Sequence, residues 1–108
     1  MTEHEVEEPS ADADGEIRVR RVDSAHAYIA AIGDRAVASL AFEQDGPSTV
    51  LIATTVVEEF RGRGVASGLI THVLDDLRAQ GSRITVECPQ VARFLEENGQ
   101  YADLQVAT

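Results

Sequence analysis

The stretch Arg61-Gly62-Arg63-Gly64-Val65-Ala66 combines residue types and spacing that suit the binding of an anion. It lies between an apolar, strand-like run at residues 49–57 and an amphipathic pattern that begins at Val65. Two glycines at such a junction allow the backbone to turn tightly and to approach a ligand closely. A helix that begins there offers unpaired N–H groups and the positive end of its dipole, and arginine pairs well with phosphate. The stretch therefore predicts that a phosphate-bearing ligand binds at a helix N-terminus.

Five strands and two helices are expected around this stretch. Alternating apolar and charged residues indicate the first strand, and Gly33-Asp34 separates two apolar runs that suit a hairpin. Apolar residues at three- and four-residue spacing indicate the long helix, with Asp75, Asp76 and Arg78 off the apolar face and Gly81 at its end. The expected elements are strands at 17–22, 27–32, 36–42, 49–57 and 84–86, with helices at 65–77 and 91–97.

This order of elements predicts an α+β domain with a mixed, mostly antiparallel sheet. A long central helix follows the fourth strand, and a short helix follows the fifth. Because a helix joins strands four and five, that pair should be parallel and connected by a right-handed crossover. A chain of 108 residues allows one such domain with a single modest core.

The net charge of −10 is spread unevenly along the chain. Residues 1–16 hold seven acidic residues and no basic one, so we expect an acidic disordered tail there. Residues 17–108 form the expected domain, with twelve acidic residues and nine arginines. Strong acidity without a basic cluster argues against nucleic acid or an anionic membrane as a partner.

The cysteine and histidine residues indicate the cellular compartment and whether a metal site is expected. The single cysteine, Cys88, excludes an intrachain disulfide and fits a reducing interior. No apolar run reaches transmembrane length, and the N-terminus lacks the basic start of a signal peptide, so we expect a cytoplasmic protein. His4 and His26 have no Cys or His neighbour at ligand spacing, and no metal site is expected.

A strand followed by Arg-x-x-Gly-x-Ala and then by a helix resembles the acyl-CoA-binding motif of the GNAT superfamily of N-acetyltransferases. The motif residues here are Arg61, Gly64 and Ala66. From about Ala27 to Leu104 the chain also resembles a subfamily of short, single-domain members. The matching positions are Cys88 after the fifth strand, then Val91, Phe94 and Leu95, and an ending at 99–104.

Two positions depart from the family pattern. The subfamily often has a histidine where this chain has Ala53, near the end of the fourth strand. Larger members often have a tyrosine that acts as the general acid on the last helix, where this chain has Leu95. Roles of those two groups cannot be transferred to this chain.

The resemblance implies direct transfer of an acetyl group from acetyl-CoA to an amine. Backbone N–H groups at Val56 and Val57 would polarise the thioester carbonyl, while the glycine-rich junction and its arginines would hold the pyrophosphate. The implied acetyl-CoA-binding residues are Val56, Val57, Arg61, Gly62, Arg63, Gly64, Val65, Ala66 and Ser67.

Glu58 and Cys88 are the candidate catalytic residues. Glu58, with its neighbour Glu59, could accept the proton of the amine directly or through water; acids before a helix also simply favour its dipole and stay solvated. The Cys88 thiol could protonate the departing CoA thiolate, or it could be a small buried apolar side chain. Tyr101 is a further candidate proton donor, or it covers the core.

Three functions remain open at this point: an N-acetyltransferase, a non-catalytic acyl-CoA-binding or regulatory domain, and a small interaction module in which the glycine-rich stretch is only a turn. About six residues separate the first two strands, which leaves no room for helices that wall the acceptor side in larger GNAT enzymes. We therefore expect an open acceptor face suited to a protein amine or a polyamine. The acidic tail could attract cationic acceptors or could only confer solubility, and a monomer or weak dimer is expected.

Overall fold

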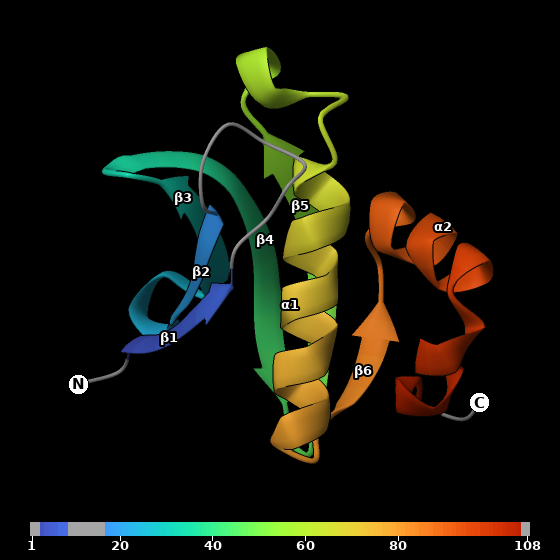
Figure 1. Ribbon diagram of the computed structural model, residues 1–108. Helices are drawn as coiled ribbons and strands as arrows, with labels where there is room; N and C mark the ends of the chain where they lie inside the picture. The colour runs from blue at the N-terminus through green and yellow to red at the C-terminus, as the bar shows by residue number, and fades with distance from the viewer. Residues whose placement is uncertain (1–2, 9–16, 107–108) are drawn as a thin grey trace.

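A computed structural model describes residues 3–8 and 17–106. One six-stranded sheet runs in the order β1-β2-β3-β4-β5-β6, with helix α1 across one face and helix α2 beside β6 (Figure 1). The strands are β1 Glu3–Glu8, β2 Ile17–Val22, β3 Ala27–Ile32, β4 Arg35–Asp45, β5 Ser48–Val56 and β6 Arg83–Val86. The helices are α1 Val65–Ala79 and α2 Pro89–Glu97, and three 3₁₀ turns are η1 Asp23–Ala25, η2 Glu58–Phe60 and η3 Gly99–Leu104.

The predicted α+β architecture is confirmed. Strands β1 to β5 pair antiparallel in sequence order, and β5 pairs with β6 in parallel. Helix α1 makes the connection between these two parallel strands, as the crossover argument requires. The five strands and two helices expected from the sequence all lie within a few residues of their expected positions.

Strand β1 differs from the expectation of a disordered tail. Glu3–Glu8 pair with β2, and the register sets Glu5 opposite Arg20 and Glu7 opposite Arg18. For these six residues the expectation of disorder is wrong; residues 1–2 and 9–16 of the expected tail lie outside the described residues.

The core lies between α1 and the sheet. Seven apolar residues of α1 were expected on one face. Ala66 is partly buried, and the other six are at most 2 % exposed: Val65, Leu69, Ile70, Val73, Leu74 and Leu77. Each buried leucine or isoleucine removes apolar area worth about 1.5–3 kcal/mol from water. This packing fixes α1 against the sheet, so the start of α1 has a defined position next to the end of β5.

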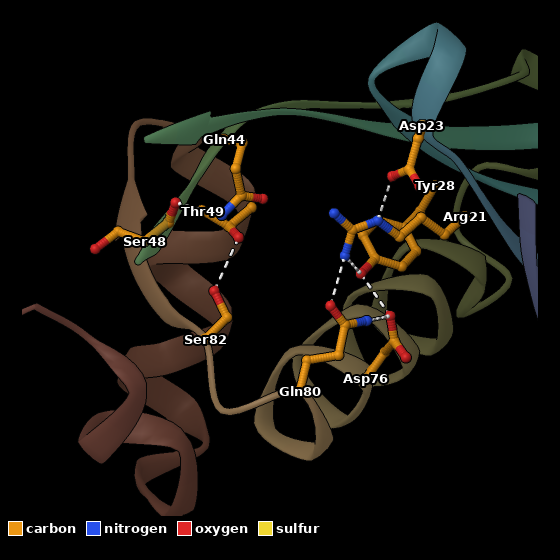
Figure 2. Close-up of polar contacts among 9 residues, drawn as sticks. All are labelled: Arg21, Asp23, Tyr28, Gln44, Ser48, Thr49, Asp76, Gln80 and Ser82. Atoms are coloured by element: carbon orange, nitrogen blue, oxygen red, sulfur yellow. Dashed lines mark hydrogen bonds and ion pairs between the residues drawn. The ribbon is translucent and has the colours of Figure 1, made fainter. Parts of the chain in front are cut away.

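A buried polar network secures the opposite end of α1 (Figure 2). The Tyr28 hydroxyl donates to Asp76 Oδ2 at 2.6 Å, and Gln80 Nε2 donates to the same oxygen at 2.7 Å. The Arg21 guanidinium donates to Gln80 Oε1 at 2.9 Å and to Asp23 at 2.7 Å. Asp76 is only 8 % exposed, so the expectation that it lies off the buried face of the helix is wrong.

Candidate functional site

The connection from β5 to α1 has a backbone that requires glycine at two positions. Gly62 and Gly64 have φ values of 78° and 80°, in the left-handed region that other residues rarely adopt. Gly64 is the N-cap residue of α1 and has no side chain to satisfy the first N–H groups of the helix. The first turn of α1 therefore presents N–H groups that no side chain caps, together with the positive end of a 15-residue helix dipole.

A cavity of about 560 Å³ opens at this helix start. Its volume lies within the range of pockets that hold small molecules and cofactors. Its lining residues come from the end of β5, the connection, the first turn of α1 and the start of α2: Thr54, Thr55, Val56, Phe60, Arg61, Gly62, Gly64, Val65, Ala66, Ser67 and Gln90. Seven of the nine residues expected to bind acetyl-CoA lie in this wall, and Val57 and Arg63 do not.

Strands β5 and β6 separate at the cavity. Their pairing runs from Ser48 to Leu51 on β5, and the N–H groups of Glu87 and Cys88 then both donate to the Leu51 carbonyl, at 2.9 and 3.1 Å. Beyond Leu51 the chain that follows β6 turns into α2. The edge of β5 after Leu51, here called the open edge, thus faces the cavity instead of a neighbouring strand.

A β-bulge sets which residues face the open edge. Ala41 is paired with Ala53 and Phe42 with Leu51, so Ile52 is the extra residue on β5. An extra residue shifts the alternation along the rest of a strand by one position. The burial pattern shows the shift, because Thr49 and Leu51 are buried before the bulge and Thr54 and Val56 after it.

The backbone of Val57 is not available to a thioester in this arrangement. Its N–H donates to the Val37 carbonyl at 2.9 Å, which directs it toward β4. Because neighbouring residues of a strand alternate between its two edges, Val56 points to the open edge. The Arg61 Nε donates to the Val56 carbonyl at 3.1 Å from that side. Of the two N–H groups expected to polarise the thioester carbonyl, only that of Val56 is directed toward the cavity.

The arginines of the connection differ in what they contact. Arg61 lines the cavity, with its Nε held by the Val56 carbonyl. Arg63 lies with its guanidinium 5.4 Å from the centre of the Phe60 ring, and Arg35 lies 5.6 Å from the same ring. Both distances suit a cation–π contact. Phe60 itself lines the cavity, so two guanidinium groups lie close to its wall.

The carboxylates expected to act as bases lie outside the cavity wall. Glu58 is exposed at the start of η2, and its backbone carbonyl accepts the N–H of Arg61 at 3.2 Å. Glu59 forms an exposed ion pair with Arg35 at 2.7 Å. The hydrogen bond from Arg35 holds the pKa of the Glu59 carboxyl below its ordinary value, which makes Glu59 a poorer proton acceptor.

Cys88 is fully buried directly before α2. Its Sγ lies 3.3 Å from Thr54 Oγ1 and 3.6 Å from Gln90 Oε1. Thr54 and Gln90 line the cavity, whereas Cys88 lies behind them. Tyr101 is also buried, and its hydroxyl donates to Asp75 Oδ1 at 2.8 Å; it is not part of the cavity wall.

A family model for GCN5-related N-acetyl-transferase matches residues 27–104 of the chain. The chain belongs to this family. The match covers the four strands β3 to β6 and both helices, and it contains the whole cavity wall. A comparison with curated proteins gave no match.

Four residues of this acetyltransferase domain were missed from the sequence although they line the cavity: Thr54, Thr55, Phe60 and Gln90. Thr54 and Thr55 lie inside the apolar run of β5, and only the bulge at Ile52 determines which of them is buried. Gln90 is brought to the site by the separation of β5 and β6, which no local pattern encodes. Phe60 was detectable, as the one aromatic residue between the strand and the glycines.

Two general findings complete the description. Within residues 3–8 and 17–106, no group of three or more His, Cys, Asp and Glu side chains is arranged to hold a metal ion. No helix in the same ranges has the length and apolar character needed to cross a membrane.

Proposed function

We propose that this domain is an acetyl-CoA-dependent N-acetyltransferase that transfers the acetyl group directly to an amine. The observation that carries the proposal is the single cavity formed by the uncapped start of α1 and the open edge of β5. An anion site and an unpaired strand edge are the two features that a phosphorylated, amide-containing arm requires. Acetyl-CoA has both parts, with its thioester at the far end of the arm.

The start of α1 would hold the pyrophosphate. Gly62 and residues 64–67 line the cavity, so their backbone N–H groups would be within reach of a phosphate, and Arg61 adds a positive charge. Arg63 adds a second positive charge beside Phe60, whereas the charge of Arg35 is balanced by its ion pair with Glu59. This local charge matters because the net charge of −10 would otherwise repel a polyanionic substrate.

The open edge of β5 would hold the acyl end. The N–H of Val56 is oriented by the ladder with β4 and needs no rearrangement to donate to a thioester carbonyl. Donors that are held in place before reaction stabilise developing negative charge most effectively. Val56 is therefore proposed to polarise the carbonyl, and this role is withdrawn from Val57.

The acceptor would approach from the face of the sheet that α1 does not cover. Only residues 23–26 join β2 to β3, so no helix of the kind that walls larger enzymes is inserted there. A shallow groove of about 210 Å³ on this sheet runs between Ile29, Ser39, Val57 and Thr55, and Thr55 also lines the acyl cavity. An open groove that meets the cavity at Thr55 suits the amine of a protein or a polyamine better than an enclosed small molecule.

Glu58 is proposed to accept the amine proton through water. Its exposed carboxylate follows Val57 directly, whereas Glu59 is committed to Arg35. Replacing Glu58 by Gln should lower kcat at neutral pH, because an amide cannot accept the proton. An unchanged kcat would assign the proton to solvent.

Calorimetry with acetyl-CoA tests the binding part of the proposal. The Arg61→Ala, Arg63→Ala variant should bind at least tenfold more weakly, because two charges close to the phosphate site are removed. A matched control is the Arg83→Ala, Arg93→Ala variant, which changes the net charge equally at two arginines outside the cavity wall. Equal losses in both variants, or no binding by the unmodified protein, would reject the site.

A non-catalytic acyl-CoA-binding domain is the second candidate. It is favoured by one observation, namely that neither Glu58 nor Glu59 lies in the cavity wall. A thiol-release assay with polyamines and lysine-rich peptides separates the two candidates. Tight binding of acetyl-CoA without thiol release for any acceptor would support the non-catalytic function.

A further inference from the structure

Three side chains from separate parts of the chain meet at the inner end of the cavity. Thr54 comes from β5, Cys88 precedes α2, and Gln90 lies in the first turn of α2. The distances are 3.3 Å from Thr54 Oγ1 to Cys88 Sγ and 3.6 Å from Cys88 Sγ to Gln90 Oε1. These contacts join the open edge of β5 to α2 at the place where β5 and β6 separate.

The three residues differ in whether they line the cavity. Thr54 and Gln90 line it, whereas Cys88 is 0 % exposed and lies behind them. A molecule in the cavity would therefore touch the hydroxyl before it could reach the thiol. Thr54 is itself only 8 % exposed, so its hydroxyl acts in a largely dehydrated position, where hydrogen bonds to charge are strong.

The hydrogen bonds orient the Thr54 hydroxyl. The carboxamide oxygen of Gln90 can only accept a hydrogen bond, so the Cys88 thiol donates its hydrogen to Gln90. The hydroxyl of Thr54 is then the donor in its contact with the sulfur of Cys88. Sulfur is a weak acceptor, and a hydroxyl can rotate away from it to a better acceptor at low cost.

We propose that Thr54 is a catalytic residue that donates a hydrogen bond to the departing sulfur of CoA, and that Cys88 and Gln90 are positioning residues that hold its hydroxyl at the cavity wall. The proposal rests on the proposed function and moves the role considered for Cys88 to a different side chain. It also explains why a thiol at this position is buried and hydrogen-bonded instead of exposed.

The chemical step balances without a further reactant. The amine nitrogen bonds to the carbonyl carbon of the thioester, the carbon–sulfur bond breaks, and the electron pair stays on sulfur. The amine loses its proton to water, and the thiolate later takes a proton from solvent. Thr54 keeps its own proton throughout and lowers the barrier by stabilising the negative charge on sulfur.

Kinetics of Thr54→Val and Thr54→Ser test the role of the hydroxyl. Valine keeps the shape of the side chain, so kcat should fall about 10- to 100-fold with little change in KM for acetyl-CoA, less than the 10²–10³ typical of a lost oxyanion donor. Serine should restore most of the rate. Thr49→Val is the matched control, because Thr49 is a buried threonine of the same strand whose hydroxyl contacts Ser82 at 2.9 Å (Figure 2). Full kcat in Thr54→Val, or an equal loss in Thr49→Val, would overturn the proposal.

A double-mutant cycle tests the positioning role of Cys88. Cys88→Ala alone should lower kcat less than Thr54→Val does, and it should cause no further loss in the Thr54→Val background. If Cys88→Ala lowers kcat more than Thr54→Val, or if the two losses multiply, the thiol acts on the substrate itself and the proposal is wrong.

A binding measurement keeps the proposal testable if no acceptor supports turnover. Thr54→Val should weaken binding of free CoA, which carries the sulfur, and should leave binding of desulfo-CoA unchanged. An equal effect on both ligands would show that Thr54 does not touch the sulfur. Failure of the unmodified protein to bind either ligand would instead reject the proposed function.

Discussion

Replacing Tyr28 by Phe tests how the fold holds α1 in the position that forms the cavity. Phenylalanine keeps the aromatic packing against Phe42, whose ring centre lies 5.4 Å from that of Tyr28, and removes only the hydroxyl. That hydroxyl donates to Asp76 Oδ2 at 2.6 Å and accepts from Arg21 at 3.3 Å. The substitution therefore removes one hydrogen bond between the sheet and the C-terminal half of α1, and a second one between β2 and β3.

The expected cost is about 2 kcal/mol of unfolding free energy. A hydrogen bond to a charged group contributes about 1.5–3 kcal/mol, and Asp76, only 8 % exposed, has little water to replace the lost donor. Gln80 still donates to the same oxygen at 2.7 Å, which places the cost toward the lower end. For a domain of this size, about 2 kcal/mol corresponds to a fall in Tm of about 8–16 °C.

Chemical and thermal denaturation measure this cost, and Tyr101→Phe provides a matched control. The Tyr101 hydroxyl also donates to an aspartate, Asp75 at 2.8 Å, but Asp75 is exposed and water can replace the donor. Tyr101→Phe should therefore cost less than about 1 kcal/mol. If Tyr28→Phe lowers the unfolding free energy no more than Tyr101→Phe does, the buried network does not stabilise the fold to the expected extent. Binding of acetyl-CoA should be unaffected, since Asp76 lies eleven residues, about 16 Å along the helix, from Val65.

The pH dependence of stability gives a second test of the same network. Burial, with the hydrogen bond to Asp76, raises the pKa of the Tyr28 hydroxyl above its ordinary value near 10. In the unfolded chain Tyr28 ionises near pH 10, while in the folded chain it stays protonated. Its contribution is therefore present below about pH 10 and decreases as the pH rises further. Between pH 9 and 11, the unfolding free energy of Tyr28→Phe should therefore fall less than that of the unmodified protein. If the unfolding free energies of both proteins have the same slope against pH, ionisation of Tyr28 does not contribute to the pH dependence.

Three further predictions concern the connection and its surroundings. Gly64→Ala should destabilise the fold by about 1–2 kcal/mol in chemical denaturation, because its φ of 80° is strained for alanine. Gly68→Ala should instead stabilise by about 0.5–1 kcal/mol, because an added Cβ meets no atom within 4 Å inside α1; the opposite order would refute the backbone argument. Arg35→Gln should raise the pKa of Glu59 toward its ordinary value in an NMR titration, with little change in Tm because the pair is exposed. Alkylation of Cys88 should be slow in the native protein and should accelerate with denaturant, and rapid labelling without denaturant would contradict its burial.

The sequence was sufficient to predict most of the fold for a physical reason. Helix α1 and strand β2 each carry a hydrophobic period that matches their structure, β3 to β6 are recognisable as short apolar runs, and glycines mark most of the turns between the elements. The parallel pairing of β5 with β6 followed from chain connectivity alone. The uncapped helix start after Gly62 and Gly64 was also predictable, because it is a local feature of the chain.

Features that depend on pairing between distant residues were not predictable in this way. Strand β1 looks like a polar, acidic tail by itself, and its local composition does not encode its pairing with β2. Asp76 looks like a solvated helix residue until Tyr28 and Gln80 are placed beside it. In both cases the missing information is the partner, which the local composition does not contain.

The bulge at Ile52 shows why the sequence predicts the proposed phosphate site better than the groups at the proposed acyl end. Residues 49–57 are apolar or threonine throughout, so the run has no alternation from which its two edges could be assigned. The extra residue directs Val56 to the open edge, sends the N–H of Val57 to Val37, and buries Thr54 beside Cys88. Without it, the alternation would present Ala53, Thr55 and Val57 to the open edge instead. The proposed pyrophosphate site is thus local to residues 61–67, whereas the groups at the proposed acyl end depend on the pairing of β5 with β4. A single residue in that pairing determines which hydroxyl and which N–H group face the cavity and would be available to the proposed reaction.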